Sequence, residues 1–191
     1  MTVDLPGGDL SLLQPAEGAE IPDDGPVEWA PIAPYWSILW RSGVTLAREV
    51  AGNELHGKRV IELGSGLGLP SLAAARAGAE VLAVDVVPEA IELLEANARK
   101  NGLTVEVALA DWCTPNPLLE YGPFDLALGA DVLYERQSTA PLLSLLPRLA
   151  PEAWIADPGR PAATSFLHQA DQRWKVETSW RGVVSVSRIR F

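Results

Sequence analysis

The chain has 191 residues, 48% of them hydrophobic and 21% charged, a composition that excludes disorder over the whole length. Its 25 Asp and Glu residues against 15 Lys and Arg residues give a net charge of −10. Because nucleic acids are bound by basic surfaces, we expect no nucleic-acid partner. A single cysteine, Cys113, excludes a disulfide scaffold and a cysteine-based zinc site.

The sequence also argues against export and membrane insertion. No apolar run approaches the roughly 18 residues that a membrane span needs. The N-terminus lacks the basic region and apolar core of a signal peptide. We therefore expect a cytoplasmic protein with no membrane partner.

Residues 1–30 differ in composition from the rest of the chain. They contain seven Asp and Glu residues, no Lys or Arg, four Pro and four Gly, which makes a long helix implausible. One interpretation is a solvated, loosely ordered tail, and the other is a flap that guides a basic partner to a nearby site. We treat residues 1–30 as an acidic N-terminal segment and residues 31–191 as one folded domain.

From Val60 onward, short apolar runs alternate with helical segments. Strands are predicted at 60–63, 81–84, 105–109, 125–130 and 154–156, helices at 70–77, 88–100 and 142–149, and a hairpin at 174–178 and 183–191 around a turn at 181–182. This alternation predicts an α/β fold: a Rossmann-like, doubly wound and mostly parallel seven-stranded sheet, with helices on both faces and a C-terminal antiparallel hairpin.

A glycine-rich loop, Gly64-Ser65-Gly66-Leu67-Gly68, follows the first predicted strand. Glycines let the backbone turn sharply and let a ligand approach without meeting a Cβ atom. Asp85 ends the second strand, where a carboxylate accepts hydrogen bonds from a ribose. The structural alternative is that Asp85 only caps a helix.

Asp111 and Trp112 follow the third predicted strand. A carboxylate there can accept a hydrogen bond from an adenine amino group, while an indole can pack on the ring. Asp111 has the same structural alternative of a helix cap. Polar groups at three consecutive strand ends favour a nucleoside site over three separate caps.

The glycine spacing does not fit a dinucleotide site. That fingerprint needs Gly at its sixth position, which is Leu69 here when counted from Gly64 and Ser71 when counted from Gly66. The spacing instead resembles motif I of class I S-adenosyl-L-methionine-dependent methyltransferases. Glu62 precedes the loop, close to where such a ligand carries its ammonium group, and a pyrophosphate would be repelled by this carboxylate.

Further motifs extend this resemblance over about Pro34 to Arg160. They are the aromatic-rich string from Pro34 to Ala47, the glycine loop, Asp111-Trp112, and Ala130-Asp131-Val132-Leu133-Tyr134. Together they resemble the seven-β-strand protein-lysine methyltransferase family, and within it the branch that modifies the β subunit of electron transfer flavoprotein. Core packing is the default alternative for Tyr35 and Trp36, and residues 1–30 match no motif of the family.

The resemblance implies S-adenosyl-L-methionine as cofactor, S-adenosyl-L-homocysteine as product, and no metal. It also implies which residues contact the cofactor: Trp40, Gly64, Ser65, Gly66, Asp85, Trp112 and Ala130. Asp131 and Tyr134 match the motif associated with the substrate lysine. We expect Asp131 to orient the amine through a hydrogen bond and Tyr134 to form a wall of the lysine channel, with a helix cap as the alternative for Asp131.

The leading prediction is an N-methyltransferase that acts on a lysine side chain of a protein partner. A small-molecule N-methyltransferase is an open alternative, because an amine pocket does not declare its substrate. A non-catalytic cofactor-binding protein is a third possibility, against which the motif at 131–134 argues. His56 and His168 are predicted to be structural, and the segment 157–160 to be either a turn or a substrate-facing loop.

Overall fold

A central sheet of seven strands organises the molecule, for which a computed structural model describes residues 1–15, 34–114 and 116–191. The strands, in the order in which they pair, are β5 (Glu106–Leu109), β4 (Glu80–Asp85), β3 (Arg59–Leu63), β6 (Leu126–Ala130), β7 (Glu152–Asp157), β9 (Val184–Arg190) and β8 (Lys175–Arg181). The first five are parallel, and β9 pairs antiparallel with both β7 and β8. The predicted sheet and hairpin are confirmed.

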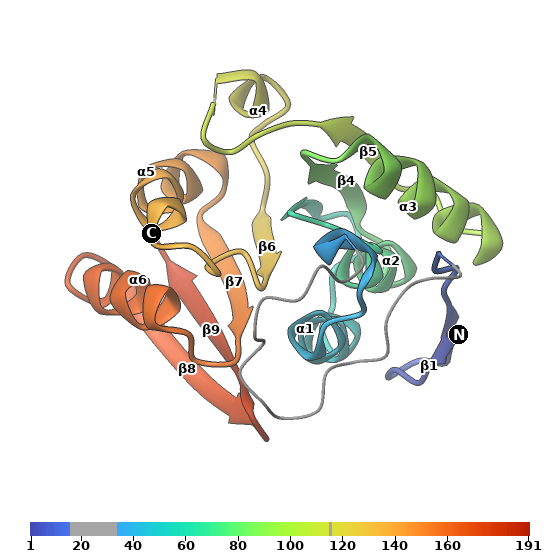
Figure 1. Ribbon diagram of the computed structural model, residues 1–191, viewed down its shortest axis with the longest axis horizontal. Coiled ribbons are helices and arrows are strands. Elements are labelled where there is room, and N and C mark those ends of the chain that lie inside the picture. Colours follow the sequence, from blue (N-terminus) through green and yellow to red (C-terminus); the bar gives the residue numbers. More distant parts are fainter. Residues whose placement is uncertain (16–33, 115) are drawn as a thin grey trace.

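Helices cover both faces of this sheet (Figure 1). One layer contains α1 (Arg41–Ala51), α2 (Leu69–Arg76) and α3 (Pro88–Lys100), and the other contains α4 (Asn116–Glu120), α5 (Thr139–Leu149) and α6 (Pro161–Asp171). Successive residues of β3 serve the two layers in turn, since Val60 belongs to one apolar core and Ile61 to the other. Among the described helices, none has the length and apolar character needed to cross a bilayer.

Proline and glycine residues mark the ends of several helices, and the predicted element boundaries differ from the observed ones by a few residues. Prolines lie in the first turns of α2, α3 and α6, and Gly78, just beyond α2, has a φ of 87°. The helix predicted at 142–149 is longer than expected, because α5 begins at Thr139. The hairpin turn lies at 182–183, one residue later than predicted.

The prediction of a loosely ordered tail is wrong for residues 1–15. Strand β1 (Thr2–Val3) pairs antiparallel with β2 (Leu10–Ser11). Four apolar side chains of this segment are buried in the core: Val3, Leu5, Leu10 and Leu12. They alternate with other residues along the strands, so that the apolar side chains lie on the face that packs on the core. The acidic composition of the segment did not indicate this packing. Residues 16–30 of the predicted acidic segment lie outside the described residues.

Two asparagines, Asn97 in α3 and Asn101 at its C-terminal end, bind the N-terminal segment. Asn97 Oδ1 accepts a hydrogen bond from Leu13 N at 2.6 Å, and Asn97 Nδ2 donates to Leu67 O at 3.1 Å. Asn101 Oδ1 accepts from Ser11 N at 2.9 Å. The buried Asn97 therefore joins the N-terminal segment, α3 and the glycine loop.

Candidate functional site

The predicted site residues lie close together at the end of the sheet where the parallel strands have their carboxyl ends. Apart from Trp40, which precedes α1, they lie at or just after the carboxyl ends of β5, β4, β3 and β6, which are neighbours in the sheet. The pairing aligns these ends, because Leu63 lies opposite Val84 on one side and Gly129 on the other. Strand order reverses between β3 and β6, the position at which open α/β sheets bind their ligands.

The glycine loop after β3 passes between an indole ring and a backbone carbonyl. Gly64 has a φ of 63°, and a Cβ atom added there would lie 3.3 Å from Trp112 Cη2 and 3.2 Å from Val132 Cγ1. A Cβ atom on Gly66, where φ is 48°, would lie 3.0 Å from Trp36 O. Both positions combine a left-handed backbone with close neighbours, so glycine is needed at each.

Ser65 carries an unused polar group inside this loop. Its side chain is buried, and its Oγ atom has no hydrogen-bond partner among the described residues. The backbone N–H of Ser65 donates to Val84 O at 3.0 Å, which fixes the residue. A buried hydroxyl without a partner costs about 1–3 kcal/mol, so this atom is suited to a polar group of a ligand.

Asp85 holds the loop against the end of β4. Its Oδ2 accepts a hydrogen bond from Gly66 N at 2.9 Å, and its Oδ1 accepts from Val87 N, at the start of α3, at 3.1 Å. The second bond forms a local turn before α3, whose N-cap residue is Val87 and which has no side-chain cap, so the alternative of a helix cap is wrong for Asp85. Each carboxylate oxygen can still accept a further bond, so the predicted ribose contact is compatible with this geometry and stays a prediction.

Glu62, in β3 just before the glycine loop, is bound to α2. It is buried, and its Oε2 accepts hydrogen bonds from the hydroxyl of Ser71 in α2 and from Ser71 N, the latter at 2.9 Å. Burial raises the pKa of Glu62 from 4.5 to about 8. The carboxyl group fastens β3 to α2, and the contact that we predicted with a cofactor ammonium group stays a prediction.

We expect Glu62 to make folding stability depend on pH. Between pH 4.5 and about pH 8 the folded chain holds a proton that the unfolded chain has lost. The free energy of unfolding should therefore fall as pH rises through this window. Glu62→Gln has no such proton to lose, so urea unfolding at about pH 5 and about pH 8.5 should show a smaller fall than in the wild type. The exposed Glu89→Gln is the control, and parallel pH dependence in all three proteins would contradict this assignment.

Trp112 and Asp111 differ in exposure at the end of β5. The Trp112 indole is buried against Gly64. Asp111 is exposed, and its Oδ1 accepts a hydrogen bond from Cys113 N at 2.8 Å. This bond forms a local turn, so the alternative of a helix cap is wrong for Asp111. The adenine contacts of both residues stay predictions.

An aromatic pair stands at the start of α1. Trp40 Nε1 donates to Tyr35 O at 3.0 Å, and the two rings stack with centroids 6.3 Å apart. Core packing is wrong for Tyr35, which is 55% exposed. Trp36 is half-buried, and its carbonyl covers Gly66, a role that residue type alone did not indicate.

Asp131 follows the half-buried Ala130 at the end of β6 and has a φ of 58°. Its backbone N–H donates to Ala156 O at 3.0 Å, and its carboxylate pairs with the guanidinium of Arg160. The alternative of a helix cap is therefore wrong for Asp131. Sequence reasoning missed this ion pair, because Asp157-Pro158-Gly159-Arg160 has the composition of an ordinary turn.

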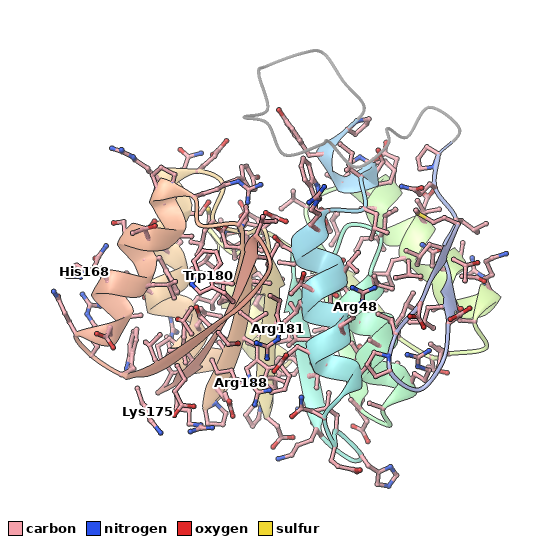
Figure 2. The ribbon with its side chains drawn as sticks, turned by 90° about the horizontal axis from the view of Figure 1, so that it is seen from below. Arg48, His168, Lys175, Trp180, Arg181 and Arg188 are labelled. Atoms are coloured by element: carbon pink, nitrogen blue, oxygen red, sulfur yellow. The ribbon has the colours of Figure 1, made fainter. Side chains whose placement is uncertain are left out.

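Tyr134 projects from the same segment and is 58% exposed. Partial burial raises the pKa of its hydroxyl, and the charges of Glu135 and Asp85 add to this effect, so the phenol stays neutral. His168 lies on the outer side of α6 (Figure 2), and His56 precedes β3 at the opposite edge of the sheet. Neither histidine follows a carboxyl strand end. No group of three or more metal-binding side chains occurs in the ranges that the structure describes.

Comparison with known proteins now identifies the family. Residues 35–155 match the family model described as lysine methyltransferase. The chain belongs to this family. The match spans the glycine loop, the strand-end carboxylates and the segment 130–134, so the resemblance inferred from these motifs is confirmed.

Curated relatives of this lysine methyltransferase family member include a protein N-lysine methyltransferase of Danio rerio, 37% identical over 121 residues, which are 60% of this chain and 55% of the relative. The electron transfer flavoprotein β subunit lysine methyltransferase of Mus musculus is 34% identical over 154 residues, 75% of this chain and 59% of the relative. A histone-arginine methyltransferase of Xenopus laevis is 35% identical over 107 residues, 53% of this chain and 46% of the relative. The chain spans about half the length of these relatives.

Solved structures share the fold. Magnesium protoporphyrin IX methyltransferase of Synechocystis PCC 6803, with bound SAM, superimposes with a TM-score of 0.60 at 21% identity and covers 78% of each chain. A TehB-like SAM-dependent methyltransferase of Corynebacterium glutamicum gives a TM-score of 0.62 at 18% identity over 76% of this chain and 86% of that chain. At these identities the likeness concerns the fold.

Proposed function

We propose that this chain transfers a methyl group from S-adenosyl-L-methionine to the side-chain amine of a lysine in a protein. One observation carries the proposal. The Asp131 carboxylate, held by Arg160, follows the strand next to the one that leads into a glycine loop with a buried and unpartnered Ser65 hydroxyl. A site that receives an amine thus adjoins a site suited to a nucleoside.

The residues at the strand ends fit this cofactor. Ser65 Oγ lacks a partner, and each oxygen of Asp85 accepts one hydrogen bond from the protein. The absence of a Cβ atom at Gly64 lets the Trp112 indole lie directly against the loop. The residues that would hold the cofactor are Trp40, Glu62, Gly64, Ser65, Gly66, Asp85, Asp111, Trp112 and Ala130. S-adenosyl-L-methionine supplies an electrophilic methyl group on a sulfonium.

The chain's own contribution is to align a neutral amine with that methyl group. A lysine has a reference pKa of about 10.4 and must lose its proton before it can attack. Neither histidine follows the carboxyl end of a strand, so neither is placed to accept that proton. Asp131 would accept a hydrogen bond from the amine and direct its lone pair, while Tyr134 would line the channel.

Lysine is favoured over arginine as the acceptor, although one relative is named a histone-arginine methyltransferase. A substrate guanidinium would need carboxylates free to bind its planar fork. The carboxylates of Asp131 and Asp157 already share the guanidinium of Arg160.

We expect Asp85→Ala to weaken binding of S-adenosylhomocysteine by about 1–3 kcal/mol, because ribose hydroxyls would be left unpaired and the Gly66 amide would lose its partner. Isothermal titration calorimetry measures this change. Asp125→Ala is the matched control, since Asp125 Oδ2 also binds a backbone amide, Arg59 N at 2.8 Å, but at the opposite edge of the sheet. Equal affinity in wild type and folded Asp85→Ala would contradict the ribose contact.

The proposed function is tested by incubating the protein with methyl-labelled S-adenosylmethionine and a cell lysate. We expect label in protein, recovered as methyl-lysine after hydrolysis. Label in methyl-arginine or in small molecules would assign a different acceptor. Tighter binding of NAD than of S-adenosylhomocysteine would contradict the cofactor assignment.

A cytoplasmic location and the absence of nucleic-acid and membrane partners stay predictions.

A further inference from the structure

Arg160 connects two carboxylates at the carboxyl edge of the sheet. Its Nη1 atom donates to Asp131 Oδ1 and lies 3.2 Å from Asp157 Oδ2. All three side chains are shielded, with exposed fractions of 27% for Arg160, 11% for Asp131 and 3% for Asp157. The guanidinium thus bridges the ends of β6 and β7.

The turn that carries Arg160 is fixed independently of Asp131. Asp157 Oδ1 accepts hydrogen bonds from Gly159 N and Arg160 N, both at 2.7 Å. The Ser185 hydroxyl donates to Asp157 O at 3.1 Å. Trp180, labelled in Figure 2, covers the turn from β8, since its Cη2 lies 3.2 Å from where a Cβ atom on Gly159 would be. The fold therefore sets the place of the guanidinium before any substrate binds.

Asp131 has a less usual backbone. Its φ of 58° is the only positive value among the non-glycine residues that the structure describes. Such conformations are disfavoured for most L-residues and cluster at functional sites, where surrounding contacts maintain them. Here those contacts are the bond from Asp131 N to Ala156 O and the ion pair with Arg160.

We propose that Arg160 is a positioning residue for methyl transfer, which holds Asp131 so that a carboxylate oxygen meets the substrate amine and whose positive charge favours the neutral amine. This inference rests on the proposed function. Arg160 itself remains charged: although burial lowers its pKa, the charges of Asp131 and Asp157 raise it above its ordinary value.

The charge of Arg160 matters because a carboxylate alone would favour the wrong form of the acceptor. Asp131 and Asp157 without Arg160 would stabilise an ammonium, which has no lone pair for attack. With Arg160 the ionised cluster has one net negative charge instead of two. In the reaction the N–C bond forms as the C–S bond breaks, the sulfur keeps the electron pair of the broken bond, and the proton passes to water. Other ionisable groups near this end of the sheet, among the described residues, include Glu62, Asp85, Asp111, Cys113, Tyr134 and Glu135.

The test is the pH profile of single-turnover methylation in the full chain, with a protein acceptor found in the lysate experiment. We expect Arg160→Gln to raise the pH of half-maximal rate by about one unit and to lower kcat near neutral pH at least about fivefold. KM for the acceptor should not rise, and the affinity for S-adenosylhomocysteine should stay within about twofold. Arg160→Lys retains the charge, so its half-maximal pH should remain near that of the wild type.

Arg188→Gln is the matched control. Arg188 Nη2 pairs with Glu49 Oε1 at 2.6 Å, and its side chain is 28% exposed, close to the value for Arg160. It lies on β9 beside Arg181 (Figure 2), and its loss should change neither the rate nor the pH profile.

An unchanged half-maximal pH in Arg160→Gln would overturn the inference. If that variant does not fold, a raised half-maximal pH in Arg160→Lys would overturn it instead. A failure of the proposed function would be seen in the wild-type protein instead. That protein would then bind S-adenosylhomocysteine and methylate no lysine.

Discussion

Replacing Asp131 with asparagine is expected to slow methyl transfer at least about tenfold, a loss of about 1.4 kcal/mol of transition-state stabilisation. Asparagine keeps the size of the side chain and, like aspartate, tolerates the positive φ of this position. Asparagine lacks the negative charge that pairs with Arg160. In the proposed function, the same charged group accepts the hydrogen bond from the amine. Affinity for S-adenosylhomocysteine should stay within about threefold, because the Asp131 side chain is not among the expected cofactor contacts and the substitution leaves its neighbour Ala130 in place.

Single-turnover methylation and a cofactor titration on the same preparation measure both quantities. The matched control is Asp125→Asn, which alters a carboxylate at the opposite edge of the sheet. Normal turnover by Asp131→Asn would remove Asp131 from the active site and, with it, much of the case for lysine as the acceptor.

The second large effect is expected on folding, at Gly68. Its φ is 78°, and a Cβ atom there would lie 2.5 Å from Cγ of the buried Leu94 in α3. Gly68→Ala should therefore lose about 1–2 kcal/mol for the left-handed backbone and a further 1–3 kcal/mol, roughly, for displacing Leu94. Urea unfolding gives the difference in the free energy of unfolding.

Gly102→Ala separates these two contributions. Gly102 has a φ of 65°, but a Cβ atom there would meet nothing within 4 Å. Gly102→Ala should therefore lower the free energy of unfolding only by the cost of the left-handed backbone. If the two variants lost the same stability, the close approach of α3 to the glycine loop would not be what requires glycine at position 68.

Much of the site followed from the sequence because its residues lie at the ends of apolar runs. Once the strands at 60–63 and 81–84 are recognised, parallel pairing places the glycine loop beside Asp85, and the bond from Gly66 N to Asp85 Oδ2 realises that expectation. The contact of the Trp112 indole with Gly64 was not predicted, and its packing on an adenine ring stays a prediction.

The parts that were not predicted depend on contacts between distant residues with no distinctive local pattern. Arg160 meets Asp131 only because β6 and β7 pair in parallel, and the Asp-Pro-Gly-Arg sequence has the composition of a turn. Ser71 binds Glu62 because α2 folds back over β3, and nothing in the type of either residue indicates that bond. In the first fifteen residues, acidic and glycine-rich composition concealed the apolar alternation that packs them.

The two outer strands of the sheet determine how this chain behaves beside copies of itself. A free sheet edge offers unpaired backbone groups and can recruit another chain. One edge strand, β5, has four residues, and the other, β8, has exposed charges at Lys175, Glu177 and Arg181. Its exposed Trp180 lies over the Gly159 turn. Short length on one side and charge on the other protect the sheet against edge-to-edge aggregation.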